Sequence, residues 1–421
     1  MKVLHLGSND ILGGAARASF RVHWALRKQG YDSTVLVAQR HSNDPTVTAL
    51  VPSMDLSMRL RRRLRRRQIL GDFARYRATR PKDLEPFSDD RSVHEFDLVK
   101  QLPACDVINL HWVAGFLDYR SFFSTLPQRT SVVWLLHDMN IMTGGCHYDD
   151  DCGRYMSGCG ACPQLGSADP EDLSRQIWKR KQEVFGALET NRLHMVAPSR
   201  WMFELVKASP LLSQFPVTLI PYGIDLEEFA PRDRSFAREV LGIPQGAQVV
   251  MFVSDSLTNR RKGFSLLAAA LSGLTQTHNL FLLSVGKGKP PVTDPIPCLH
   301  IGQVWDDRWL SLIYSAADLF VIPSLHDNLP NTVLESMACG TPVVGFDVGG
   351  IPDMVRSGTT GQLVPVGDSV ALGHAITHLL NTPSTCRQMA AECRRIAIEE
   401  YSYELLASRY AALYESVSHT P

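Results

Sequence analysis

The residues best suited to chemistry lie in one run, 326–344, which reads HDNLPNTVLESMACGTPVV. The run predicts a polar loop, a helix of about two turns capped by Asn331 or Thr332, a glycine stop and a strand. The N–H groups and the dipole at the start of such a helix attract a phosphate. Glu335 can accept hydrogen bonds from two vicinal hydroxyls, as on a ribose, and Asp327 can reach sugar hydroxyls. The run therefore indicates a site for a phosphate and a sugar.

Three cations follow a predicted strand, Val249–Val253, in the segment 254–263, which reads SDSLTNRRKG. Cleavage of a sugar from a nucleoside diphosphate leaves negative charge on phosphate oxygens, and guanidinium and ammonium groups stabilise that charge. Arg260, Arg261 and Lys262 are therefore candidates for holding a diphosphate. A solvated basic loop at the start of a helix is the alternative.

The N-terminal half adds further candidates. Gly13 and Gly14 precede a predicted helix, where glycine lets the backbone approach a ligand closely. They do not complete the dinucleotide pattern G-x-G-x-x-G, which argues against a nicotinamide dehydrogenase. His111, Trp112 and His137 stand at the ends of two predicted strands, and a hydrogen-bonded core histidine is the alternative for His137.

The run 326–344 resembles the signature of the family-4 retaining glycosyltransferases of the GT-B type. There, two carboxylates eight positions apart bracket a loop and a helix, and a segment like Met-Ala-Cys-Gly-Thr-Pro-Val follows. Asp327 and Glu335 take these two positions here. The family usually has Glu first, followed by an aromatic residue and a glycine, whereas this chain has Asp-Asn-Leu-Pro.

The cationic loop resembles the same family. Lys262, before Gly263, matches the family's lysine, whereas Leu257 occupies the usual arginine position, so that role transfers to Arg261 or Arg260. The resemblance covers nearly the whole chain. Within the family, the chain resembles above all the bacterial branch that builds cell-surface polysaccharides and exopolysaccharides.

The resemblance implies a UDP- or GDP-sugar donor, a glycan or lipid-linked saccharide acceptor, and retention of the anomeric configuration without a cofactor for catalysis. It places His137 at the reacting centre, Gly13 and Gly14 over the donor phosphates or the acceptor, and His111 and Trp112 on the acceptor side. A GT-B sugar-nucleotide epimerase and a non-catalytic carbohydrate-binding relative are the alternatives.

Strands and helices that alternate along the chain must position these residues. Lys2–Gly7, Arg17–Gln29 and Thr34–Ala38 form a predicted βαβ unit, and a second such series begins at Val249. The fold class is therefore α/β, with two Rossmann-like, doubly wound parallel-sheet domains of the GT-B type facing a central cleft. We expect an acceptor-side domain over 1–210, a donor domain over 211–395, and a C-terminal helix over 396–421 that packs back toward the first domain.

Four of the nine cysteines, Cys146, Cys152, Cys159 and Cys162, crowd into a glycine-rich loop over 144–166. Two pairs of thiols at this spacing suit a structural Zn²⁺ site, in which four protein ligands leave no open position. Disulfides and free thiols are the alternatives, and His147 is a substitute ligand.

A basic insertion over about 55–80 contains the tract Arg59–Arg67, in which seven of nine residues are arginine. Polybasic segments bind anionic lipid headgroups with ~1 kcal/mol per charge. A solvated helix is the alternative, and a nucleic-acid interface lacks the aromatic residues it needs.

Composition bounds the remaining classes. The 43 Lys and Arg balance 43 Asp and Glu, so overall charge gives no argument for nucleic-acid binding. No stretch approaches the ~18 apolar residues of a membrane span, and the start MKVLHLGSND is too quickly polar for a secretory signal. We therefore expect a cytoplasmic protein, peripheral on the inner face of the plasma membrane.

Overall fold

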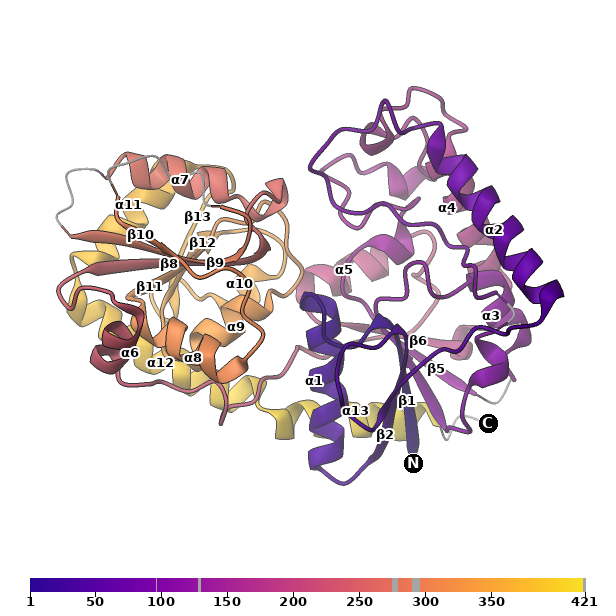
Figure 1. The fold of residues 1–421 in the computed structure, drawn as a ribbon, viewed down its shortest axis with the longest axis horizontal. Coiled ribbons are helices and arrows are strands. Elements are labelled where there is room, and N and C mark those ends of the chain that lie inside the picture. The colour runs from indigo at the N-terminus through magenta and orange to yellow at the C-terminus, as the bar shows by residue number, and fades with distance from the viewer. Residues whose placement is uncertain (96, 128–129, 275–278, 290–295, 419–421) are drawn as a thin grey trace. The chain divides into compact units, whose positions relative to one another are not determined.

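The computed structural model describes residues 1–95, 97–127, 130–274, 279–289 and 296–418. The chain divides into two compact units, one of residues 1–221 with the chain from Leu406 onward, the other Tyr222–Leu405. The sequence placed these divisions at 210/211 and at 395/396. Each unit is built on one parallel sheet (Figure 1), so the predicted α/β class with two doubly wound sheets is confirmed.

The first unit contains a seven-stranded sheet in the order β3-β2-β1-β4-β5-β6-β7, in which every neighbouring pair is parallel. Its strands are β1 Lys2–Asn9, β2 Asp32–Gln39, β3 Val47–Ala49, β4 Val107–Leu110, β5 Ser131–Leu135, β6 Leu193–Ala197 and β7 Val217–Leu219. Its helices are α1 Gly14–Lys28, α2 Leu56–Ala74, α3 Tyr119–Thr125, α4 Leu173–Gly186, α5 Arg200–Ala208 and most of α13 Tyr403–Ser418.

The second unit contains a six-stranded parallel sheet in the order β10-β9-β8-β11-β12-β13. Its strands are β8 Gln248–Ser256, β9 Leu280–Lys287, β10 Cys298–His300, β11 Leu319–Ile322, β12 Val343–Phe346 and β13 Gly361–Val364. Its helices are α6 Arg234–Leu241, α7 Phe264–Ser272, α8 Asp307–Ala316, α9 Asn331–Ala338, α10 Ile351–Met354, α11 Ser369–Leu380 and α12 Pro383–Tyr401. Helices α7 and α11 lie on one side of this sheet and α8 and α9 on the other (Figure 1).

The central strands are largely buried because helices cover both faces of each sheet. All four residues of β4, of β11 and of β12 are buried. Burial of one such aliphatic side chain contributes roughly 1.5–3 kcal/mol, so these strands are rigid supports for the loops at their ends.

The order of the chain reverses once in each sheet, between β1 and β4 in the first and between β8 and β11 in the second. In open α/β sheets, ligands bind beyond the carboxyl ends of the strands at such a point. These two strand pairs are therefore where each unit can hold a ligand.

Candidate functional site

An ion pair spans the reversal point of the second sheet. Lys262 follows β8, Asp327 follows β11, and Lys262 Nζ lies 2.7 Å from Asp327 Oδ2. Arg261 Nη1 lies 3.6 Å from the same carboxylate oxygen, and Ser324 Oγ donates to it at 3.2 Å. The structure thus brings three predicted site residues together at the edge where a ligand is expected.

The short turn Arg260–Lys262 is held against the loop that follows β11. Arg261 Nη1 donates to the carbonyl oxygen of His326 at 2.6 Å, and the N–H of Leu325 donates to the carbonyl oxygen of Arg261 at 2.8 Å. Gly263 ends the turn at φ +69°, where a Cβ atom would collide with the carbonyl oxygen of Pro323. Glycine is therefore required for this close approach.

Asp327 is 6% exposed and is charged at neutral pH. Burial by itself would raise the pKa of this carboxyl group. The charges of Lys262 and Arg261 and the hydrogen bonds from Lys262 and Ser324 outweigh burial, so the pKa lies below its ordinary value. Asp327 is therefore an anionic acceptor for hydroxyl groups, held in place by cations.

Glu335 lies in α9 and is 3% exposed. Its Oε2 accepts a hydrogen bond of 3.2 Å from the hydroxyl of Tyr314, a fully buried residue of α8. A carboxylate buried in this way is held in one position, which suits recognition of two adjacent hydroxyls.

The start of α9 corrects one prediction. Asn331 and Thr332 are the first two residues inside the helix, and Pro330 is the N-cap residue, without a side-chain cap. The prediction was wrong because the extended backbone of Pro330, with φ −69° and ψ 121°, ends the preceding loop before Asn331. Asn331 and Thr332 thus contribute first-turn backbone N–H groups, the groups that attract anions at a helix start.

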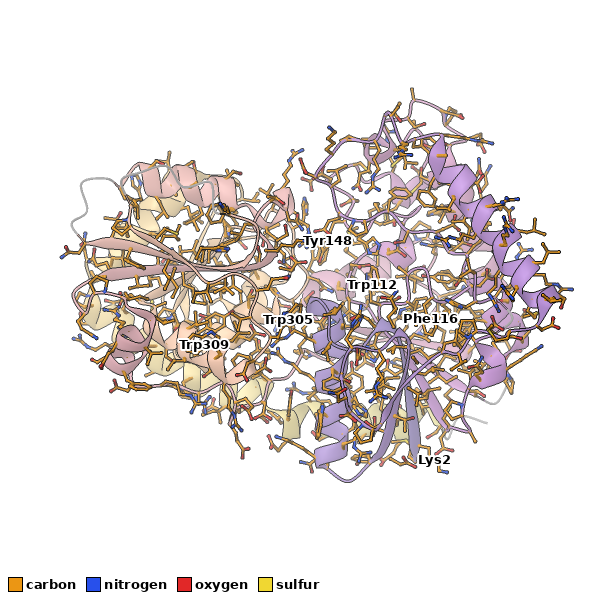
Figure 2. The ribbon with its side chains drawn as sticks, viewed as in Figure 1. Lys2, Trp112, Phe116, Tyr148, Trp305 and Trp309 are labelled. Carbon is orange, nitrogen blue, oxygen red and sulfur yellow. The ribbon has the colours of Figure 1, made fainter. Side chains whose placement is uncertain are left out.

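An open hollow of about 830 Å³ lies after β10 and at the start of α8. Trp305 and Trp309, both labelled in Figure 2, line it together with Ile301 and Val304. Trp305 is 54% exposed, so the hollow offers an aromatic surface on which a planar ring can stack.

In the first unit, three histidines form a chain of hydrogen bonds that runs from β1 to the residues just after β4 and β5. His5 Nδ1 lies 2.8 Å from His111 Nε2, and His111 Nδ1 lies 3.3 Å from His137 Nε2. Burial lowers the pKa of all three, that of His137 to about 4. The chain is therefore uncharged at neutral pH, and each contact joins one N–H to one bare nitrogen.

A small cavity of about 20 Å³ brings His111, Trp112 and His137 together with Asp138 and His147. Trp112 Nε1 donates to Asp138 Oδ2 at 2.9 Å, and His147 Nδ1 lies 2.6 Å from the same oxygen. The rings of Trp112 and His147 stack with centroids 5.3 Å apart. The three predicted residues are thus joined through Asp138 into one polar cluster.

The predicted glycines lie at the start of α1. Gly13 is the N-cap residue at φ 87°, and Gly14 is the first residue of the 15-residue helix. A Cβ atom at Gly13 would meet nothing within 4 Å, so the glycine is required by its backbone angle rather than by packing.

The predicted residues therefore form two groups, one in each unit. Lys262, Arg261, Asp327 and Glu335 belong to the second unit, whereas Gly13, Gly14, His111, Trp112 and His137 belong to the first.

Sequence reasoning missed several residues that support these groups, namely His5, Tyr314, Ser324 and Gly349. Gly349 packs its backbone against that of Asp327, where a Cβ atom would collide with the carbonyl oxygen. The doublet Gly349–Gly350 after β12 was a signal for such a close approach.

Comparison with known proteins finds a family similarity within the second unit. Residues 247–382 match the family Glycosyl transferases group 1. The chain is 30% identical over 237 residues to alpha-maltose-1-phosphate synthase of Mycolicibacterium smegmatis, covering 51% of this chain and 60% of that protein. It is 35% identical over 191 residues to D-inositol 3-phosphate glycosyltransferase of Mycobacterium sp. (strain KMS), covering 42% of each chain. The match thus spans 60% or less of the length of these relatives.

The whole chain also matches a solved structure in fold. HepE of Anabaena, in complex with UDP-glucose, matches 99% of this chain and 100% of its own with a TM-score of 0.67 and 16% identity. At that identity the likeness concerns the fold. Residues 247–382 are thus similar to the family Glycosyl transferases group 1, and the two parallel-sheet α/β units have the fold class of GT-B proteins.

Proposed function

We propose that this protein is a retaining glycosyltransferase that moves a sugar from a UDP- or GDP-sugar to a glycan or lipid-linked saccharide acceptor in polysaccharide biosynthesis. The observation that carries the proposal is the cluster of Lys262, Arg261 and Asp327 at the reversal point of the second sheet, with Glu335 on the helix that follows. The family match over 247–382 and the UDP-glucose complex of HepE support a nucleotide-sugar donor.

Each residue of this cluster has a role in donor binding. Lys262 and Arg261 turn from Asp327 toward the diphosphate, and the first-turn N–H groups of α9 assist them. Asp327 then accepts hydrogen bonds from the sugar and Glu335 from the ribose, while the base stacks in the hollow beside Trp305. Lys262 and Arg261 thus leave the Asp327 carboxylate for the diphosphate and remain paired with an anion in both states.

The reaction needs no carboxylate nucleophile in this proposal. The acceptor oxygen bonds to the anomeric carbon on the face from which the diphosphate leaves, and the bond from that carbon to the phosphate oxygen breaks. The acceptor proton passes to a phosphate oxygen, and the charge left on the diphosphate is held by Lys262 and Arg261. His137, uncharged at neutral pH, orients the sugar at the reacting centre.

A panel of UDP- and GDP-sugars tests the proposal. We expect one donor to raise the melting temperature, and transfer to a saccharide acceptor to give a product with the donor's anomeric configuration by NMR. Glu335→Gln should weaken donor binding, whereas Glu399→Gln, which alters an exposed glutamate of α12, should not. If incubation with the donor alone gives its 2-epimer, the protein is an epimerase instead. If it binds glycans without transferring a sugar, it is a lectin-like protein.

Helix α2 supports a membrane-bound location for this enzyme. None of its residues is buried, and its inner side is anchored by ion pairs of Arg62 with Asp97 and of Arg65 with Asp118, both at 2.7 Å. None of the described helices has the length and apolar character needed to cross a bilayer. Any membrane contact of α2 is therefore expected at the surface.

The outer face of α2 is both apolar and basic. Leu56, Leu60 and Leu64, at four-residue spacing, and Leu70 are 55–77% exposed. They share a face because residues four apart lie one above another on a helix. Exposed arginines lie among and beside them, namely Arg59, Arg61, Arg63, Arg66 and Arg67. A leucine stripe bordered by arginines fits an anionic lipid surface, which we take to be the inner face of the plasma membrane.

Flotation with lipid vesicles tests this location. We expect recovery with vesicles containing phosphatidylglycerol but not with pure phosphatidylcholine, and loss of recovery in Arg59→Glu/Arg63→Glu/Arg67→Glu. The matched variant Arg120→Glu/Arg387→Glu/Arg395→Glu alters three exposed arginines outside α2 by the same charge and should still float. Equal recovery with both vesicle types, or preferential binding to nucleic acid, would overturn the proposal.

A further inference from the structure

The four clustered cysteines line one small pocket. Cys146, Cys152, Cys159 and Cys162 all border a cavity of about 10 Å³ in the loop between β5 and α4. Cys146 and Cys162 are buried, and the other two are half-buried. A cavity of this size has room for about one water-sized particle. All four thiols are free, although they face the same space.

Backbone N–H groups are directed at the sulfur atoms. The N–H of Gly144 donates to Cys159 Sγ at 3.2 Å. The N–H of Arg154 faces Cys152, and the N–H groups of Gln164 and Leu165 face Cys162. Sulfur is a weak acceptor as a thiol and a strong one as a thiolate, so these contacts stabilise a metal-bound thiolate. Burial has the opposite effect and raises the pKa of all four free thiols, so the metal itself must supply the charge that removes their protons.

The loop is folded so that these contacts form. Left-handed backbone conformations recur throughout it, at Gly145, Asp150, Asp151, Gly153, Gly158, Cys159, Gly160, Ala161 and Gly166. Three of its glycines are sterically required, since a Cβ atom there would collide with a carbonyl oxygen: Gly144 with that of Ser174, Gly160 with that of Pro170 and Gly166 with that of Thr79. Non-glycine residues at positive φ are uncommon, and four in one loop indicate that a specific geometry is maintained.

Positive charge is buried beside the pocket. Lys181 of α4 is 0% exposed, and its Nζ donates to the carbonyl oxygens of Asn140 and Thr143, the latter at 3.0 Å. Cys146 and Cys159 lie close enough to interact with this ammonium group electrostatically, as do Asp89 and Asp90. A buried cation is costly unless negative charge lies nearby, and a tetrathiolate zinc centre carries net negative charge.

We propose that Cys146, Cys152, Cys159 and Cys162 bind one structural Zn²⁺ ion as thiolates, each releasing its proton to solvent on binding. Among the residues that the structure describes, no three potential ligands already stand at coordinating positions, so the thiols rotate inward to the ~2.3 Å zinc–sulfur distance. His147 is not a fifth ligand, since its Nδ1 bonds Asp138 and its Nε2 lies 2.7 Å from Ser88 Oγ.

The proposed ion stabilises the loop that carries His147. His147 contacts Asp138 and stacks on Trp112, which line the same cavity as His137. The zinc centre would therefore position the polar cluster of the first unit without contacting a substrate. Because it is a structural centre, metal content and activity can be measured separately.

Metal analysis of the full chain, purified without chelator under reducing conditions, tests the site. We expect about one zinc per chain by mass spectrometry, as a single tetrahedral site requires. Cys152→Ser/Cys162→Ser should lose the zinc, whereas Cys105→Ser/Cys298→Ser, which alters two cysteines outside the loop, should retain it. Substitution by Co²⁺ should give the intense near-ultraviolet bands of cobalt–thiolate bonds in the wild type and the control variant only.

Two results would overturn the proposal. One is wild-type protein without zinc in which all four thiols react with a thiol reagent in the folded state. The other is a mass of the purified protein that is lower than that of the fully reduced chain by two hydrogens for each disulfide formed. If the double variant does not fold, the wild-type protein provides the test. A chelator should lower its melting temperature, and added zinc should restore it. A melting temperature that neither the chelator nor zinc changes would contradict the site.

Discussion

Lys262 and Asp327 are 65 residues apart in the chain, and their charged atoms lie 2.7 Å apart in the second unit. The parallel pairing of β11 with β8, in which Leu319 lies opposite Val250, brings the ends of the two strands together. The ion pair thus lies at the ligand-binding edge of the sheet. In the proposed function, binding of the donor breaks this pair.

Loss of the Lys262 ammonium should abolish most of the transfer activity. In Lys262→Ala, Asp327 keeps only the more distant Arg261, and one of the two cations for the diphosphate is absent. We expect kcat to fall about 10²–10³-fold, as on removal of one preorganised charge-stabilising group. Arg395→Ala, which removes an exposed cation of α12 that pairs with Glu392 and Glu399, is the control. Unchanged kcat in Lys262→Ala would contradict the assigned role.

Gly263 can be tested against a glycine of the same conformation. A Cβ atom at Gly263 collides with the carbonyl oxygen of Pro323, whereas one at Gly242, at φ +67°, meets nothing within 4 Å. Gly242→Ala should cost only the left-handed backbone penalty, roughly 1–2 kcal/mol. Gly263→Ala should lower the free energy of unfolding by roughly 1–3 kcal/mol more, because the turn must move. Urea unfolding measures both, and equal losses would show that the close approach is unimportant.

The hydroxyl of Tyr314 should matter for nucleotide binding although it is buried. Tyr314→Phe removes the hydrogen bond to Glu335 Oε2, and such a bond contributes about 1 kcal/mol. We expect the Kd for the donor to rise about fivefold to tenfold by calorimetry. Tyr410→Phe is a matched control, since the buried hydroxyl of Tyr410 has no hydrogen-bond partner among the described residues. An unchanged Kd in Tyr314→Phe would contradict the proposed contact between Glu335 and the ribose.

The neutral histidines predict a loss of stability in mild acid. Burial lowers the pKa of His137 to about 4, below the ~6.5 of an unfolded chain. The unfolded state therefore binds more protons as the pH falls below about 6.5, and the free energy of unfolding decreases down to about pH 4. The contribution of His137 is on the order of 3 kcal/mol at about 1.4 kcal/mol per pKa unit. His137→Gln should show a shallower decline in urea unfolding between pH 7 and 4.5, and an identical slope would contradict a neutral His137.

The elements of the second unit were largely predictable. Strand β8, Gln248–Ser256, contains the predicted strand Val249–Val253, and α9, Asn331–Ala338, is the helix of about two turns predicted within 326–344. The three-residue edge strands β3 and β10 were missed. Three residues are too short for a periodic pattern, and their extended form depends on pairing with β2 and β9.

The contacts of the candidate site were less predictable than its residues. Local spacing placed Asp327 and Glu335 on a loop and a helix, and Lys262 before a glycine. It gave no sign that His5 bonds His111, because that contact depends on β1 pairing with β4, about a hundred residues later in the chain. The N-cap of α9 was predicted one or two residues too late, at Asn331 or Thr332 instead of Pro330. The two alternatives differ only in the backbone angles of these neighbouring residues.

The sequence by itself determined the α/β class, the alternation of elements and which residue types stand at the ends of the strands. Hydrophobic period and turn residues act over a few positions, and these features depend on nothing more distant. Only the tertiary structure decided that Lys262 contacts Asp327, that Tyr314 donates to Glu335 and that four thiols share one cavity. The first two contacts follow from strand order and helix packing, which no local pattern encodes. The four thiols are close in the chain, and their spacing predicted a shared site, but the cavity that they border is a feature of the folded loop.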